Sequence, residues 1–338
     1  MDTRAILLVA FAALPAAVVG QPAPPPIIDM HLHAVPYTSQ GPPPLGFCAN
    51  QAFPAPTSGT EWPAVFMSAF KDPPCEDPIW SPESDQELRE RTQAVMERRN
   101  VYGLTSGDLV DAWKTGMPER VIPSLMFGLA DTRPSVDSLR AWFERGRYAA
   151  LAEVGIQYQG RTPDDSAFAP YLALAEELDV PVGIHIGTGP PGAPYLGFGA
   201  YRAALHSPLL LEPVLVRHPK LRIFIMHAGW PMLDDLLAVM WAHPQVYVDV
   251  GIISYGLPRK AFHRYLERIV EAGFGQRVMF GSDQMVWPEA LESAIQAIES
   301  AEFLSAQQKR DILYENAARF LRLSDEERAR HHGRDPTG

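Results

Sequence analysis

Four short segments place histidine or aspartate side chains where a hydrophobic strand would carry apolar ones. The segment IIDMHLH at 27–33 contains His31 and His33, which are separated by one residue. Because successive side chains of a β-strand alternate between its two faces, both imidazoles would project to the same side and could bind one metal ion together. The other segments contribute His185 in PVGIHIG at 181–187, His227 in LRIFIMHAG at 221–229 and Asp283 in RVMFGSD at 277–283.

These three later residues all fall near the carboxyl end of a predicted strand. In a parallel α/β barrel such strand ends meet at one rim, where the five side chains would converge. Imidazole nitrogen together with carboxylate oxygen suits Zn²⁺ and similar divalent cations, and an open coordination position lets the cation activate water. A single buried histidine would be read as hydrogen-bonded core and a single strand-end aspartate as a helix cap, but the repeated placement favours a metal site.

The alternation of short apolar runs with amphipathic helical segments is typical of βα repeats. Eight runs are predicted to be strands, at 27–33, 101–107, 120–129, 150–158, 181–187, 221–229, 246–251 and 277–283. Eight strands that are each followed by a helix close most simply into an α/β fold of the (β/α)8 TIM-barrel type, with a doubly wound open sheet as the alternative. We therefore predict one metal-dependent TIM-barrel domain over 27–323.

A long insertion at 34–82 follows the first predicted strand, where the active-site loops of a barrel emerge. It is rich in Pro and Gly, and it is either a lid over the site or a loop without such a role. Both cysteines of the chain, Cys48 and Cys75, lie in it. Export would place them in an oxidising compartment, where they form a disulfide or remain two free thiols.

The two ends of the chain differ from the barrel segment in composition. Residues 1–20 combine a basic start, an apolar run and small residues, so we predict a signal peptide, followed by a Pro-rich linker at 21–26. The run is short for an uncleaved membrane span, so we expect no stable anchor after cleavage and a periplasmic or secreted location. Residues 324–338 form a charged tail, which we expect to be frayed, with His331 and His332 in solvent.

The charge of the chain argues against a nucleic-acid partner. Its 29 Lys and Arg residues against 40 Asp and Glu residues give a formal net charge of -11. Nucleic-acid affinity comes largely from basic side chains that contact phosphates. We therefore expect a small-molecule substrate.

Candidate substrate residues lie in the glycine-rich loop after His185 and directly after His227. Arg202 could bind a carboxylate with both ends of its guanidinium, or could lie in solvent at the start of a helix. Tyr195 and Tyr201 could stack on a ring, and Trp230 could form a wall of the pocket.

The motifs DMHLH, VGIHIG, FIMHAGWP and FGSD, with the closing segment ILYENAARFLRL, resemble the amidohydrolase superfamily. The resemblance is to the amidohydrolase-related branch that includes aminocarboxymuconate semialdehyde decarboxylase, and it covers nearly the whole mature chain. It implies that His31, His33, His185 and Asp283 hold the metal and that Asp283 also takes a proton from the activated water. It further implies that His227 binds a second metal or acts on the substrate or water as a catalytic residue.

The role of Glu153, in AEVGIQY, determines whether the site would hold one metal ion or two. The segment is similar to the GEIGLDY of TatD-type deoxyribonucleases, in which a strand-end Glu bridges two metals. Alternatively, Glu153 orients one of the histidines or pairs with an Arg. We therefore expect one or two divalent ions, with Zn²⁺ as the first choice.

The favoured function is an exported hydrolase that uses metal-activated water on an amide, ester or lactone of a small molecule. The alternative is a metal-dependent decarboxylase, a lyase, of an unsaturated or aromatic carboxylic acid, because fold and ligands are shared by both reactions. A phosphoesterase or nuclease, and a non-catalytic metal-binding protein, are weaker alternatives.

Overall fold

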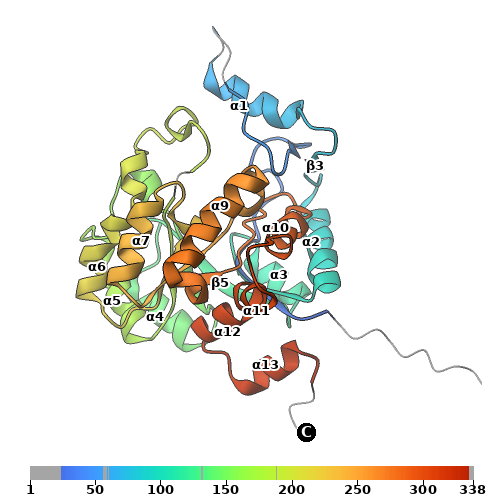
Figure 1. Ribbon diagram of the computed structural model, residues 1–338. Coiled ribbons are helices and arrows are strands. Elements are labelled where there is room, and N and C mark those ends of the chain that lie inside the picture. Colours follow the sequence, from blue (N-terminus) through green and yellow to red (C-terminus); the bar gives the residue numbers. More distant parts are fainter. Residues whose placement is uncertain (1–23, 56–58, 60, 131, 188, 335–338) are drawn as a thin grey trace, which may run out of the picture.

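The computed structural model describes residues 24–55, 59, 61–130, 132–187 and 189–334 (Figure 1). Eight parallel strands follow one another around a single sheet in chain order. They are β1 (Ile27–His33), β4 (Val101–Ser106), β5 (Val121–Phe127), β6 (Ala150–Val154), β7 (Val182–His185), β8 (Ile223–Met226), β9 (Val246–Asp249) and β10 (Val278–Met279). The predicted signal peptide lies outside the described residues.

Backbone hydrogen bonds join the two ends of this sheet. The Met30 amide in β1 donates to the Phe280 carbonyl just after β10 at 2.9 Å, and the Asp283 amide donates to the His31 carbonyl at 2.7 Å. The sheet therefore curls into a nearly closed barrel, which confirms the predicted TIM-barrel class and excludes the open doubly wound sheet. All eight predicted strands are present.

Helices surround the barrel and cover the outer faces of its strands (Figure 1). The connecting helices are α2 (Asp85–Arg99), α3 (Val110–Gly116), α4 (Val136–Glu144), α5 (Ala169–Glu177), α6 (Glu212–Arg217), α7 (Leu233–Ala242), α8 (Ile253–Gly256), α9 (Arg259–Ile269) and α10 (Ala290–Glu299). The chain then passes through α11 (Ala306–Arg310), α12 (Asn316–Phe320) and α13 (Asp325–His331). Among the described residues, no helix combines the length and apolar character that crossing a bilayer needs.

A register shift in β1 determines which of its side chains reach the site. The pairing of β1 with β4 is interrupted between Asp29 and Leu32. Ile28, before the shift, and Met30, within it, pack with Phe224 in a buried cluster that is separate from the larger one under the outer helices. A bulge changes which residues face inward, so His31 and His33 can point toward the site although Ile28 and Met30 also point inward.

The insertion at 34–82 is a folded unit. Its strands β2 (Gly46–Phe47) and β3 (Ile79–Trp80) pair antiparallel, and α1 (Trp62–Lys71) lies between them in the chain. A Cys48–Cys75 disulfide links the segments on either side of α1, so of the two alternatives left open by the sequence the structure shows the disulfide. The ring of Phe70 stacks on Trp287 of the barrel at 5.4 Å between centroids, so the insertion is packed against the barrel.

For the part of the tail that the structure describes, residues 324–334, the expectation of fraying is wrong. Ser324 caps α13 by accepting a hydrogen bond from the Glu327 amide, and the Glu327 side chain accepts from the Ser324 amide in return. The ring of His331 stacks on Tyr102 with centroids 3.6 Å apart, so this histidine is packed against the barrel and is not in solvent. The helix was not expected from this charged segment because a reciprocal cap, and not an apolar face, defines its start.

Candidate metal centre

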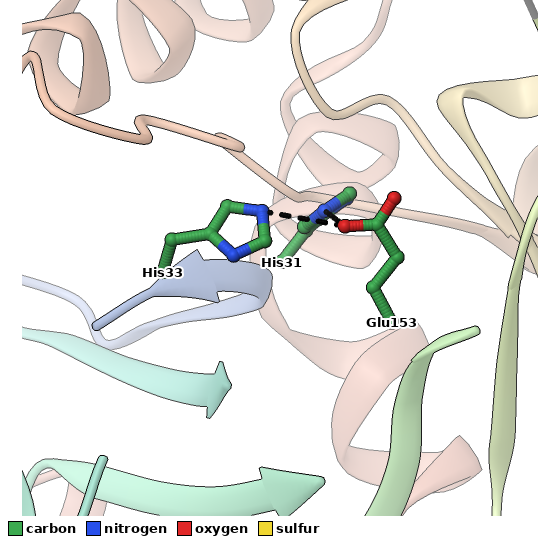
Figure 2. A group of neighbouring side chains, drawn as sticks. All are labelled: His31, His33 and Glu153. Atoms are coloured by element: carbon green, nitrogen blue, oxygen red, sulfur yellow. Dashed lines mark ion pairs between the residues drawn. The ribbon is translucent and has the colours of Figure 1, made fainter. Parts of the chain in front are cut away.

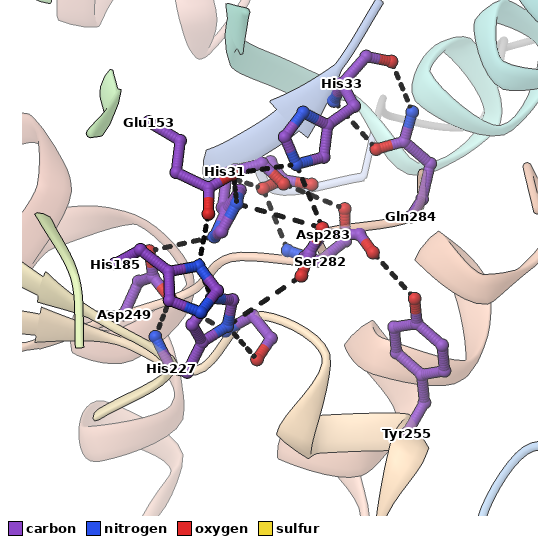
Figure 3. Close-up of polar contacts among 12 residues, drawn as sticks. His31, His33, Glu153, His185, His227, Asp249, Tyr255, Ser282, Asp283 and Gln284 are labelled. Carbon is purple, nitrogen blue, oxygen red and sulfur yellow. Dashed lines mark hydrogen bonds and ion pairs between the residues drawn. The ribbon is translucent and has the colours of Figure 1, made fainter. Parts of the chain in front are cut away.

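The structure brings all six predicted metal ligands together at the carboxyl ends of the strands (Figure 3). They come from five places on the rim: His31 and His33 from β1, Glu153 from β6, His185 from β7, His227 directly after β8 and Asp283 after β10. Their ligand atoms form three overlapping groups, in each of which all atoms lie within 4.8 Å of one another. The groups are His31, His33 and Glu153; His31, His227 and Asp283; and Glu153, His185 and His227.

Glu153 belongs to two of these groups and directs a different oxygen at each. Its Oε2 lies 3.6 Å from Nε2 of His31 and 3.6 Å from Nε2 of His33 (Figure 2). Its Oε1 contacts Nδ1 of His185, which in turn lies 3.0 Å from Nε2 of His227. A carboxylate in this position can share its two oxygens between two cations.

Asp283 lies on the other side of the centre. Its Oδ1 is 3.0 Å from Nε2 of His33 and 3.8 Å from Nε2 of His31, while its Oδ2 is 3.8 Å from Nδ1 of His227. The Tyr255 hydroxyl donates to the Asp283 carbonyl at 2.7 Å. Asp283 is therefore fixed through its backbone, and its carboxylate is free to act on the centre.

Oxygen atoms lie beside Nδ1 of two of the histidines. Nδ1 of His227 lies 3.1 Å from the Gly251 carbonyl, which can only accept, so this nitrogen carries the hydrogen. Nδ1 of His31 lies 3.3 Å from Oδ2 of Asp249. Nε2 of the neutral His227 therefore keeps a lone pair that faces His185, as metal coordination requires, and Asp249 can accept the Nδ1 hydrogen of His31 when its Nε2 binds a metal.

Three residues that the sequence analysis did not assign hold the ligands in place. Oδ1 of the buried Asp249 accepts from the amides of His227 at 3.0 Å and Gly251 at 2.8 Å. Oδ1 of Asp29 accepts from the amide of His31 at 2.9 Å. Asp249 lies near the end of the predicted strand VYVDVG and is the last residue of β9 (Val246–Asp249), so the strand-end criterion that selected Asp283 would also have found it.

Gln284 is the third of these residues. Its Oε1 accepts from the amide of His33 at 2.9 Å, and its Nε2 donates to the carbonyl of the same residue at 2.7 Å. With these two hydrogen bonds the side chain pairs with the backbone of His33 in the way that a neighbouring strand would. Nothing in the sequence distinguishes this glutamine from an ordinary rim residue.

The charges in the centre are strongly coupled. Burial disfavours the protonated form of His31, but Asp283 and Asp249 outweigh that effect and hold its pKa well above the usual range. Burial would raise the pKa of Glu153, yet His185 and His31 hold it well below the usual range. Burial, with His185 and His31 nearby, lowers the pKa of His227 to about 4. The ionised Glu153 and the neutral His227 are thus in the ionisation state that binds a metal, whereas His31 would release a proton on binding one.

The donor set fits a divalent cation. Nε2 of His31 is buried and has no hydrogen-bond partner, although carboxylate oxygens surround it. A cation among these imidazole nitrogens and carboxylates would satisfy that atom and offset the buried negative charge. This centre can therefore hold a divalent metal.

The sequence model described as Amidohydrolase matches residues 28–323 of the chain. The chain belongs to the amidohydrolase family. It is a metal-dependent enzyme of the amidohydrolase superfamily, as the resemblance of its motifs implied. A sequence search of curated proteins finds no match for this amidohydrolase.

Solved structures share the fold of this amidohydrolase at low sequence identity. An uncharacterized TIM-barrel protein from Bordetella bronchiseptica is 18% identical, with a TM-score of 0.59 over 91% of this chain and 100% of that chain. Manganese-bound 5-carboxyvanillate decarboxylase from Novosphingobium aromaticivorans is 15% identical, with a TM-score of 0.58 over 90% and 100%. 4-Oxalomesaconate hydratase from Rhodopseudomonas palustris is 18% identical, with a TM-score of 0.55 over 90% and 98%.

The predicted substrate residues of this amidohydrolase are not gathered in the way the metal ligands are. The guanidinium of Arg202 donates to the carbonyls of Gly199 at 2.9 Å and Tyr201 at 2.6 Å, within its own loop. Tyr195 is 71% exposed, whereas Tyr201 is buried. Trp230 is partly buried and packs against the core. The substrate roles of these four residues stay predictions.

Proposed function

We propose that this amidohydrolase is an exported hydrolase with two divalent metal ions, acting on an amide, ester or lactone of a small molecule. The position of Glu153 supports the proposal most directly, because its two oxygens face two sets of ligand nitrogens. His31, His33 and Asp283 would hold one ion, and His185 and His227 the other, with Glu153 shared between them.

The protein side of the reaction follows from the placement of Asp283. Divalent cations bound here would lower the pKa of a water toward about 7 and polarise a carbonyl oxygen. The carboxylate of Asp283 has one oxygen 3.0 Å from Nε2 of His33 and the other 3.8 Å from the ring of His227, so it can accept a proton from the water and return it to the leaving group. His227, with Nε2 turned toward His185, acts as a ligand in this scheme.

Zn²⁺ is the metal we propose, because imidazole nitrogens and carboxylate oxygens form its common protein sites. The same donors bind Mn²⁺, the ion in the structurally similar 5-carboxyvanillate decarboxylase. Metal content of the purified protein distinguishes the two.

Decarboxylation is the second candidate, because several proteins of similar fold are decarboxylases. A 2,6-dihydroxybenzoate decarboxylase is 13% identical, with a TM-score of 0.55. A similar structure from Acinetobacter baumannii is a probable 2-pyrone-4,6-dicarboxylic acid hydrolase, 14% identical with a TM-score of 0.53. Arg202, which we considered for holding a substrate carboxylate, uses one guanidinium nitrogen to donate to carbonyls of its own loop. A phosphoesterase or nuclease would lack the basic surface that phosphates need, since the net charge is -11.

We further propose that the insertion is a lid over the metal centre. Nε1 of Trp62 at the start of α1 donates to the Pro191 carbonyl at 2.7 Å. Pro191 follows β7, which is fifth in the strand order, while the insertion follows β1, which is first. These strands lie on opposite sides of an eight-stranded barrel, so the hydrogen bond would bridge the barrel mouth.

A direct test assays the purified protein, reconstituted with Zn²⁺ or Mn²⁺, on two substrate panels. The first contains uncharged aryl esters, lactones and N-acyl amides, and the second contains hydroxybenzoates with released CO₂ as the readout. The proposal expects turnover on the first panel. CO₂ release without hydrolysis would replace it with the decarboxylase function.

A further inference from the structure

Tyr158 contacts the metal ligand His185 at the ring nitrogen that does not face the other ligands. It lies in the short 3-10 helix η1 (Ile156–Gln159) that follows β6, the strand that carries Glu153. Its hydroxyl is 3.1 Å from Nε2 of His185, while Nδ1 of the same ring faces Glu153 and His227. Thus Nε2 of His185 faces the tyrosine, and Nδ1 faces the other metal ligands.

Two other histidine ligands likewise have an oxygen atom beside one ring nitrogen while the second nitrogen faces other ligands. His31 has Asp249 and His227 has the Gly251 carbonyl at the nitrogen turned away from the centre. His185 can bind a cation through Nδ1 only if the ring hydrogen sits on Nε2. The tyrosine oxygen is the acceptor for that hydrogen.

The surroundings of Tyr158 keep its hydroxyl in this place. A Cβ at Gly189 would lie 2.5 Å from the Tyr158 oxygen, so a side chain there would collide with it. The Gly189 amide donates to the Tyr201 hydroxyl at 2.8 Å, which holds the loop against Tyr158.

We propose that Tyr158 is a positioning residue: its hydroxyl accepts the Nε2 hydrogen of His185 and so holds Nδ1 toward the ion that Glu153 and His227 also bind. The inference rests on the proposed two-metal centre. Tyr158 acts through His185 and needs no contact with the substrate.

The test compares Tyr158→Phe with Tyr171→Phe on α5, which removes a hydroxyl that donates to the Pro134 carbonyl at 2.9 Å and has no contact with His185. Zn²⁺ alone is titrated into each chelated, full-length protein, and the two stepwise affinities are measured calorimetrically. Loss of such a hydrogen-bond partner typically weakens metal affinity about 10- to 100-fold. We expect that loss for one equivalent in Tyr158→Phe, with the other equivalent unchanged, and both unchanged in Tyr171→Phe.

A second readout is independent of turnover. In the Zn²⁺-loaded wild type, nitrogen-15 NMR should show a protonated, exchange-protected Nε2 on His185, and the protection should disappear in Tyr158→Phe. Unchanged affinities and unchanged exchange in Tyr158→Phe would overturn the inference. If the wild type bound one ion and Tyr158→Phe weakened that ion, the role of Tyr158 would stand while the two-metal hydrolase would fail.

Discussion

Glu153 and His185 contact each other at the carboxyl ends of the neighbouring strands β6 and β7, through Oε1 and Nδ1. The other oxygen of Glu153 is directed at His31 and His33. A glutamate that only oriented one histidine would need a single such contact. The pairing of Glu153 with ligands on both sides is the basis of the proposed two-metal centre.

Asp283→Asn should lower kcat far more than it lowers metal content. An amide oxygen can still ligate weakly, but it cannot accept and return a proton, and such proton transfer is worth about 10²- to 10⁴-fold in rate. The measurements are kcat on the best substrate of the hydrolysis panel and metal equivalents per chain. Turnover within a factor of two of wild type would remove Asp283 from the chemistry.

Trp62→Phe should raise KM without emptying the metal centre. The substitution keeps an aromatic ring but removes the hydrogen bond to Pro191, whose net value is about 0.5–1.5 kcal/mol. Trp241→Phe on α7, where the wild-type side chain is 81% exposed, is the matched control. Reduction of the Cys48–Cys75 disulfide should change KM in the same direction. A KM equal to that of the control in both experiments would mean that the insertion is not a lid.

Gln284→Leu should lower the free energy of unfolding, because it removes two hydrogen bonds to the backbone at the end of β1. It leaves the amide and carbonyl of His33 without their side-chain partners, and an unsatisfied buried group costs about 1–3 kcal/mol. The free energy of unfolding of the metal-free protein, from urea titration, measures this loss. Gln296→Leu on the exposed face of α10 serves as the control, and equal stability of the two variants would contradict the assigned role of Gln284.

Acid should weaken the packing of the tail helix α13 on the barrel. Burial is the main cause that lowers the pKa of His331 from 6.5 to about 4. The unfolded chain therefore binds an extra proton between these pH values, so the stability from neutral His331 is complete above about pH 6.5 and is lost as the pH falls toward about 4. Between pH 7 and pH 5, metal-free wild type should lose more unfolding free energy than His331→Phe. An equal loss would show that His331 does not titrate as described.

The barrel and the metal ligands could be predicted from sequence because both leave local patterns. Each strand is a short apolar run, and each ligand lies at or near the end of one. The supporting residues could not be predicted in the same way. Gln284 acts by binding the backbone of His33, which is 251 positions away, and Tyr158 acts through a ring from another strand. Such contacts depend on how the barrel closes, and no local periodicity encodes them. The order of α13 was missed because its packing contact, His331 on Tyr102, is equally non-local.

The most direct test of the central claim is the metal content of the purified mature protein, with wild type compared to Glu153→Gln by elemental analysis after saturation with Zn²⁺ and removal of free ions. We predict two equivalents per chain in the wild type and one in the variant, because the amide loses the charge that lets one side chain serve two cations. One equivalent in both proteins would contradict the bridged centre, make Glu153 a residue that only orients a histidine, and leave decarboxylation as strong a candidate as hydrolysis.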